Sequence, residues 1–87
     1  MAEPTSPFHP PLKRSVEIAG HKTSISLEPV FWDALVSAAE EERLPINALV
    51  ARIDLERAQA PVPPGLASAI RVWLMLRFAG SVTALED

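Results

Sequence analysis

Lys22, Ser24 and Ser26 are the residues of this chain whose types and spacing best fit a binding chemistry. They lie two residues apart, so in an extended strand their side chains share one face. An ammonium group and two hydroxyls can donate to phosphate oxygens or to base edges, and a two-stranded β-ribbon is narrow enough to enter the major groove of DNA. A solvent-exposed sheet face without a ligand is an equally good interpretation of the same pattern.

Asn47, Lys13 and Arg14 are further candidates for contacts with a nucleic-acid backbone. Asn47 lies at the start of a predicted helix, where free backbone N–H groups favour an anion and where a short polar side chain can also act as a cap. Lys13 and Arg14 follow a proline-rich segment and could reach phosphates from a flexible arm, or could simply keep the chain in solution.

Charge and composition exclude several other chemistries. The formal net charge is −3, which by itself disfavours nucleic acid, but the cations concentrate between Lys13 and Lys22 while acids collect at 40–42 and 86–87. The chain has no cysteine, three scattered glycines and two distant histidines, so we expect no thiolate site, no phosphate-binding glycine loop, no metal, no cofactor and no catalysis.

The hydrophobic periodicity predicts a mainly α fold with one short β-strand per chain. Alternation predicts the strand over 22–27, preceded by a similar segment over 12–18 that forms either a hairpin with it or a ribbon edge with a bulge at Gly20. Pro29 opens a helix that closes near Arg43. Ile46, Leu49, Val50 and Ile53 mark one face of a second helix.

The remaining segments give the predicted domain organisation. Residues 1–11 are a flexible proline-rich arm, 12–58 the core, 59–65 a proline-rich linker, 66–80 a C-terminal helix stopped by Gly80, and 81–87 a tail. No secretory leader and no membrane-spanning run is evident, which favours a cytoplasmic protein.

A single copy of so short a chain is expected to leave its strand uncovered. With 48 % hydrophobic residues, the chain predicts a homodimer whose two strands form one intertwined antiparallel ribbon, with higher oligomers through Leu66–Phe78. The residues predicted to form the dimer core are Ile25, Leu27, Phe31, Leu35, Leu49, Val50 and Ile53. Trp32 and Trp73 are expected to pack with them rather than to stack on a ligand.

Three segments, Thr23–Leu27, Glu28–Leu35 and Ile46–Val50, together resemble the ribbon-helix-helix family of the Arc and methionine repressors. Flanking sequence, including Lys13–Val16 and Ser68–Arg71, resembles a bacterial subfamily in which a third helix follows the core. The resemblance implies an intertwined dimer in which Lys22, Ser24 and Ser26 face the bases and Asn47 contacts phosphate. Two of these three strand positions are serine, and Arg43-Leu44-Pro45 stands where the family usually has an inter-helix glycine.

The sequence therefore predicts a dimeric transcriptional regulator that binds double-stranded DNA and represses by steric exclusion. The alternative is a protein–protein interaction or antitoxin-like module on the same scaffold, with weak or no DNA binding. Binding to duplex DNA that falls steeply with salt would distinguish the regulator from the module.

Overall fold

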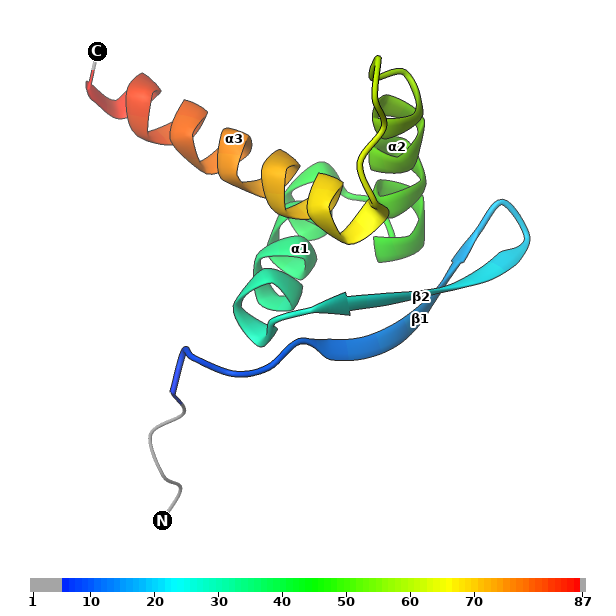
Figure 1. Cartoon of the computed structure of the whole chain (residues 1–87). Helices are drawn as coiled ribbons and strands as arrows, with labels where there is room; N and C mark the ends of the chain where they lie inside the picture. The colour runs from blue at the N-terminus through cyan, green and yellow to red at the C-terminus, as the bar shows by residue number, and fades with distance from the viewer. Residues whose placement is uncertain (1–5, 87) are drawn as a thin grey trace.

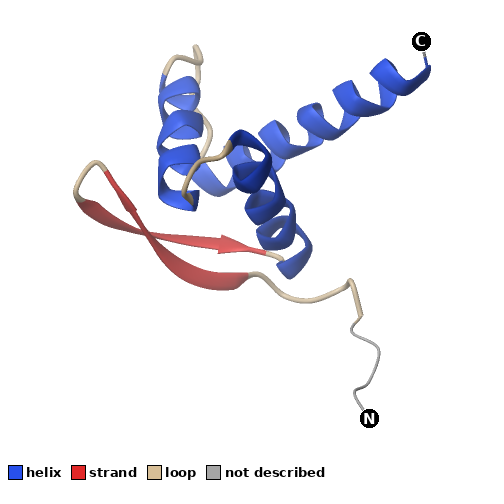
Figure 2. Ribbon diagram, turned by 180° about the vertical axis from the view of Figure 1, so that it is seen from behind, coloured by secondary structure: helices blue, strands red, loops and turns tan. Residues whose placement is uncertain are grey.

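A computed structural model describes residues 6–86 of the chain, with side chains for residues 6–80. Strands β1 (Leu12–Ile18) and β2 (His21–Leu27) form a two-stranded ribbon. Helices α1 (Pro29–Glu42), α2 (Ile46–Ala58) and α3 (Leu66–Glu86) all lie on one side of this ribbon (Figure 1). The view from behind shows the same two layers, with the second half of α3 extending beyond the other helices (Figure 2).

The ribbon is a hairpin within one chain. β1 pairs antiparallel with β2 in a register that runs from Leu12 opposite Leu27 to Ile18 opposite His21. Ala19 and Gly20 form the connection with φ of 50° and 83°, the left-handed pair that a two-residue type I′ turn requires. The chain thus contributes two strands where the sequence analysis expected one, and segment 12–18 is the hairpin partner that it had left open.

The alternation of apolar residues explains why the chain reverses at Ala19 and Gly20. In β1 the inward residues have even numbers, such as the buried Val16, whereas in β2 they have odd numbers, such as the buried Ile25. In one continuous strand these two sets would point to opposite faces. A reversal brings both sets to the same side, where the helices cover them.

Helix α1 begins and ends at residues with special backbone geometry. Pro29 occupies the first turn after the extended Glu28, where its missing N–H costs nothing. Arg43 closes the helix in the left-handed conformation with φ 57°, and the N–H of Leu44 donates to the carbonyl of Ala39 at 2.9 Å. Arginine therefore adopts the conformation for which glycine is the usual residue at this kind of helix end.

Helix α3 is longer than the sequence analysis predicted. It continues through Gly80 to Glu86, whereas a stop at Gly80 was expected. Glycine weakens a helix interior by about 1 kcal/mol, which the surrounding helix can absorb. No proline follows to end it, so the predicted tail over 81–86 is helical.

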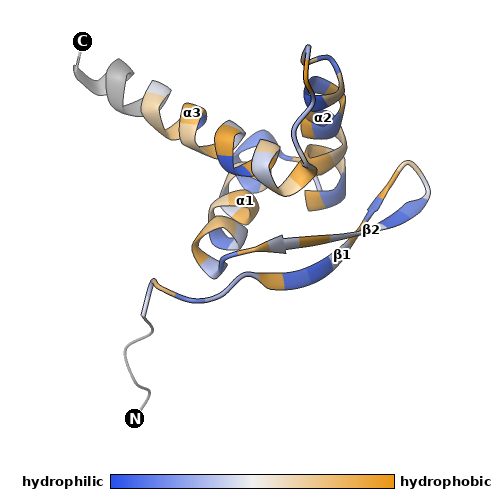
Figure 3. Ribbon diagram, viewed as in Figure 1, coloured by the Kyte–Doolittle hydropathy of each residue, from blue (hydrophilic) through white to orange (hydrophobic). Residues whose placement is uncertain are grey.

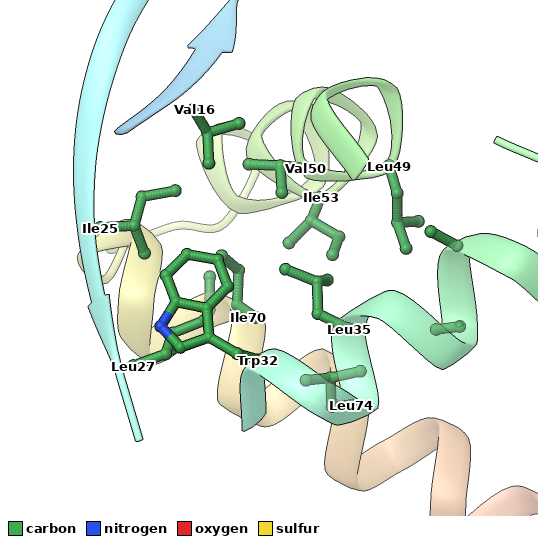
Figure 4. Packing of buried hydrophobic residues seen from close by; sticks show 13 residues of the cluster. Val16, Ile25, Leu27, Trp32, Leu35, Leu49, Val50, Ile53, Ile70 and Leu74 are labelled. Carbon is green, nitrogen blue, oxygen red and sulfur yellow. The ribbon is translucent and has the colours of Figure 1, made fainter. Parts of the chain in front are cut away.

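A hydrophobic core closes within the single protomer. Thirteen buried residues from the strands and the three helices converge between the ribbon and the helices (Figure 4). Six of the residues predicted for a dimer core are buried here, namely Ile25, Leu27, Leu35, Leu49, Val50 and Ile53. Phe31 is only partly buried, and Trp32 fills the centre instead, with its indole N–H donating to the Leu12 carbonyl at 2.9 Å. Trp73 packs against the cluster from α3, as expected for a structural residue.

Candidate nucleic-acid interface

The outer face of the ribbon is polar and exposed. The register places Lys13 opposite Ser26, Ser15 opposite Ser24, and Glu17 opposite Lys22, and directly opposed residues share a face. The side chains on this outer face are therefore Lys13, Ser15, Glu17, Lys22, Ser24 and Ser26, all of them exposed. The hairpin brings together four of the predicted site residues from two segments of the chain.

Ser15 and Glu17 are members of this face that the sequence analysis did not identify. The signal was present, because both residues alternate with Val16 in the same way that Ser24 alternates with Ile25. What was missing was the pairing of β1 with β2, which turns two separate alternating segments into one surface. Glu17 opposite Lys22 also reduces the positive charge at that end of the ribbon.

Arg14 does not belong to the outer face. It is part of β1 rather than of a flexible arm, which corrects the expectation for both Lys13 and Arg14. Its guanidinium lies 5.1 Å from the centroid of the Trp32 ring, a cation–π distance that holds the side chain at the helix-facing side of the ribbon. The ring is itself oriented by the hydrogen bond to the Leu12 carbonyl.

Arg14 and Asn47 line the same surface hollow. This hollow measures about 290 Å³, and Trp32 and Ile46 form part of its wall. Asn47 is the second residue of α2, and its exposed side chain does not cap the helix, because Pro45 is the N-cap residue. The predicted capping role of Asn47 is therefore wrong, while the side chain stays available to a ligand.

The start of α2 presents backbone donors toward this hollow. The carbonyl of Pro45 accepts hydrogen bonds from the N–H groups of Ala48 and Leu49, both at 3.1 Å. The N–H groups of Ile46 and Asn47 precede these in the first turn and have no acceptor among the described residues. A guanidinium and the positive end of a helix dipole thus lie at one hollow and favour an anion there, while Glu17, which lines the same hollow, opposes it.

Four of the five arginines of the helical half pair with carboxylates, and Arg43 at the end of α1 is the exception among the described residues. Arg77 contacts Glu41 and Glu42 at 2.9 Å each, and Arg52 contacts Glu42 at 3.3 Å. Arg71 contacts Glu28 at 2.9 Å, which ties α3 to the start of α1. Arg57 pairs with Asp54 at 2.9 Å and donates to the Pro64 carbonyl.

These ion pairs contribute to lower pKa values for the carboxyls of Glu28 and Glu42 and to a higher pKa for Arg77. The Glu28 backbone amide and then the Arg71 guanidinium hold the pKa of the Glu28 carboxyl below its ordinary 4.5. Hydrogen bonds from Arg77 and then Arg52 lower the pKa of Glu42 in the same way. Its carboxylate partners, Glu41 first, raise the pKa of Arg77. These four arginines are therefore engaged in contacts within the protein.

The distribution of unpaired cations differs sharply between the two halves. Of the eight Lys and Arg residues, four are paired with carboxylates as described above, which leaves Lys13, Arg14, Lys22 and Arg43. Among the described residues, none of these four has a carboxylate partner within ion-pair distance. Three of the four lie on the ribbon, so the net charge of −3 conceals a local excess of positive charge there.

Other kinds of site find little support in residues 6–86. No group of three or more His, Cys, Asp or Glu side chains in the described part of the chain could hold a metal ion. None of the helices described is long and apolar enough to cross a membrane.

Comparison with known protein families agrees with this geometry. The family model for the ribbon-helix-helix domain matches residues 11–78, which span both strands, α1, α2 and α3 as far as Phe78. The chain therefore belongs to the ribbon-helix-helix family, with an added third helix. Domains of this family are typically DNA-binding regulators or antitoxins, and they usually form dimers. Searches of the curated proteins and of the solved structures gave no match.

Proposed function

We propose that this protein is a dimeric transcriptional regulator that reads the major groove of operator DNA with the outer face of its β-hairpin. The observation that carries the proposal is the concentration of unpaired cations on the ribbon, while the arginines of α2 and α3 are bound to carboxylates. Three of the four unpaired cations lie on the ribbon, and such a local excess of positive charge attracts a polyanion.

In this proposal the two parts of the interface have different tasks. Lys22 and Lys13 donate to guanine acceptors or to phosphate, and Ser24 and Ser26 contact base edges with weaker discrimination. Arg14, on the helix-facing side of the ribbon, and Asn47, at the start of α2, contact the phosphate backbone, which sets the position of the ribbon in the groove. The protein bound at its operator would then block RNA polymerase sterically.

The decisive experiment is a titration of labelled duplex DNA carrying the operator, measured by fluorescence anisotropy at several salt concentrations. Lys22→Ala should weaken specific binding by about 1–3 kcal/mol, the range for a base-contacting side chain. Arg52→Gln is a matched control, since it removes one positive charge that lies against Glu42 and Trp73 rather than on the ribbon. Equal losses from both variants would contradict a specific role for Lys22.

A second candidate function is a protein-interaction or antitoxin-like module that has little affinity for DNA. Two observations favour it: serine at three of the six outer-face positions of the ribbon, and large apolar side chains exposed on α3. The same titration separates the two functions. A DNA-binding regulator binds random duplex at low salt and loses that affinity as salt rises, whereas the module does not bind duplex at any salt.

A further inference from the structure

Helix α3 carries two arginines that contact opposite ends of α1. Over 66–80 the charged residues of α3 are Arg71 and Arg77, and Figure 3 shows the hydrophobic colouring of much of this helix. Arg77 is bound to Glu41 and Glu42 in the last turn of α1. Arg71 contacts the other end of α1, where β2 leads into the helix. Of the two arginines, Arg71 is therefore the one that lies close to the candidate nucleic-acid interface.

Arg71 makes three kinds of contact at the junction between β2 and α1. Its Nε donates to Oε1 of Glu28 at 3.0 Å, and its Nη2 lies 2.9 Å from the same oxygen. Nη2 also donates to the carbonyl of Ser26 at 3.4 Å. The guanidinium carbon lies 5.7 Å from the centroid of the Phe31 ring, which is within cation–π range. One side chain of α3 thus reaches both the end of the ribbon and the first turn of α1.

The junction between β2 and α1 is a single residue long. β2 ends at Leu27 and α1 begins at Pro29, so Glu28 alone connects the ribbon to the helix. The backbone of Glu28 is extended, with φ −60° and ψ 149°, and its carbonyl accepts hydrogen bonds from the N–H groups of Phe31 and Trp32 at 2.9 and 3.1 Å. Because both neighbours of Glu28 belong to regular elements, its two backbone angles set the direction of the ribbon end relative to α1. A contact that restrains Glu28 therefore restrains the ribbon.

Ser26 is the outer-face residue next to this junction. Its side chain lies on the polar face opposite Lys13, whereas the neighbouring Leu27 is fully buried. Each strand of a two-stranded sheet has one edge without a strand neighbour. Arg71 donates to the Ser26 carbonyl in place of such a neighbour. The end of β2 is therefore held from the core by Leu27 and from α3 by Arg71.

We propose that Arg71 is a positioning residue, which fixes the junction at Glu28 and through it the direction in which Ser26 and the opposite Lys13 present their side chains to DNA. This inference rests on the proposed function, because the face that Arg71 positions is the one proposed to read the operator. Arg71 itself makes no contact with DNA in this arrangement. Its loss should therefore reduce the discrimination between operator and random duplex. The number of phosphate contacts, and with it the salt dependence of binding, should stay the same.

Arg71→Gln tests the proposal, with Arg77→Gln as the matched control. Both variants remove one cation from the same helix, both arginines contact carboxylates at 2.9 Å, and their side chains are 32 % and 29 % exposed. The wild-type protein first selects its preferred duplex from a randomised library, and anisotropy titrations then compare the affinity for that duplex with the affinity for random duplex. Arg71→Gln should lower this affinity ratio roughly tenfold at an unchanged salt slope, and Arg77→Gln should leave the ratio as it is. Equal losses in both variants, or an unchanged ratio in Arg71→Gln, would overturn the proposal.

Amide hydrogen exchange, measured by NMR without DNA, tests the junction separately. Arg71→Gln should speed the exchange of the two N–H groups that bond to the Glu28 carbonyl roughly tenfold. Arg77→Gln should instead act at the other end of α1, on the N–H of Leu44. An acceleration spread evenly over the protein in Arg71→Gln, or none at the junction, would contradict the positioning role. A wild-type chain that binds no duplex would reject the proposed function, and the exchange rates would still decide whether Arg71 fixes the junction.

Discussion

The ribbon and helix α3 both expose side chains to solvent, and the exposed side chains of the two regions differ in chemical type. The ribbon exposes Lys13, Lys22 and serine hydroxyls, with its apolar residues turned toward the helices. Helix α3 does the reverse: its arginines are bound to Glu28, Glu41 and Glu42, and its exposed side is apolar. The difference shows that net charge and total hydrophobicity alone say little about binding. What matters is which charged side chains lack an ion-pair partner within the protein and which apolar side chains stay exposed.

The largest expected effect separates the two sides of α3. Ile70→Ala should lower the free energy of unfolding by about 2–5 kcal/mol, because Ile70 is fully buried and its removal leaves a cavity. Leu76→Ala should change it by less than about 0.5 kcal/mol at concentrations where the chain is monomeric. Urea denaturation checks both values. Similar losses would mean that Leu76 is packed within the protomer.

A smaller effect compares a ribbon cation with a helix cation. Arg14→Ala should reduce the slope of log K against log salt for duplex binding by about 1, and weaken binding to all sequences alike, as the loss of one phosphate contact does. Arg71→Ala should leave that slope unchanged, since Arg71 is bound to Glu28. Anisotropy titrations across a salt series measure both slopes. An equal change in slope would remove the distinction between the two regions.

The smallest effect is a dependence of stability on acidity that arises in the helical half. The folded-state pKa values of Glu28 and Glu42 lie below 4.5, so the stability these carboxylates contribute is present above that pH and is lost as the pH falls through the lowered values. The thermal unfolding midpoint should therefore fall as the pH is taken below 4.5. Glu42→Gln should flatten this dependence, because it removes the carboxylate that Arg77 and Arg52 contact.

The sequence was sufficient to predict most of the local structure. Period-two alternation identified the face that Ser24 and Ser26 share, and the spacing of Leu49, Val50 and Ile53 identified the buried side of α2. Proline marked the starts of α1 and α2. These signals are reliable because they arise from the geometry of a single strand or helix, which neighbouring residues determine.

The prediction was less complete where a residue depends on a distant partner. Arg14 was grouped with Lys13, but the Trp32 ring holds it on the other side of the ribbon. Ser15 and Glu17 became part of the candidate interface only through their pairing with β2. Gly80 was expected to end α3, yet the helix continues past it.

The amino-acid sequence by itself determined which residues of each element face inward, where the helices begin, and that the ribbon would carry lysine and serine. The tertiary structure decided that β1 pairs with β2 in the same chain, and which cations are neutralised by carboxylates far along the chain. The physical reason is that periodicity acts over a few residues, whereas strand pairing and ion pairs join groups as distant as Glu28 and Arg71, whose encounter depends on how the whole core packs.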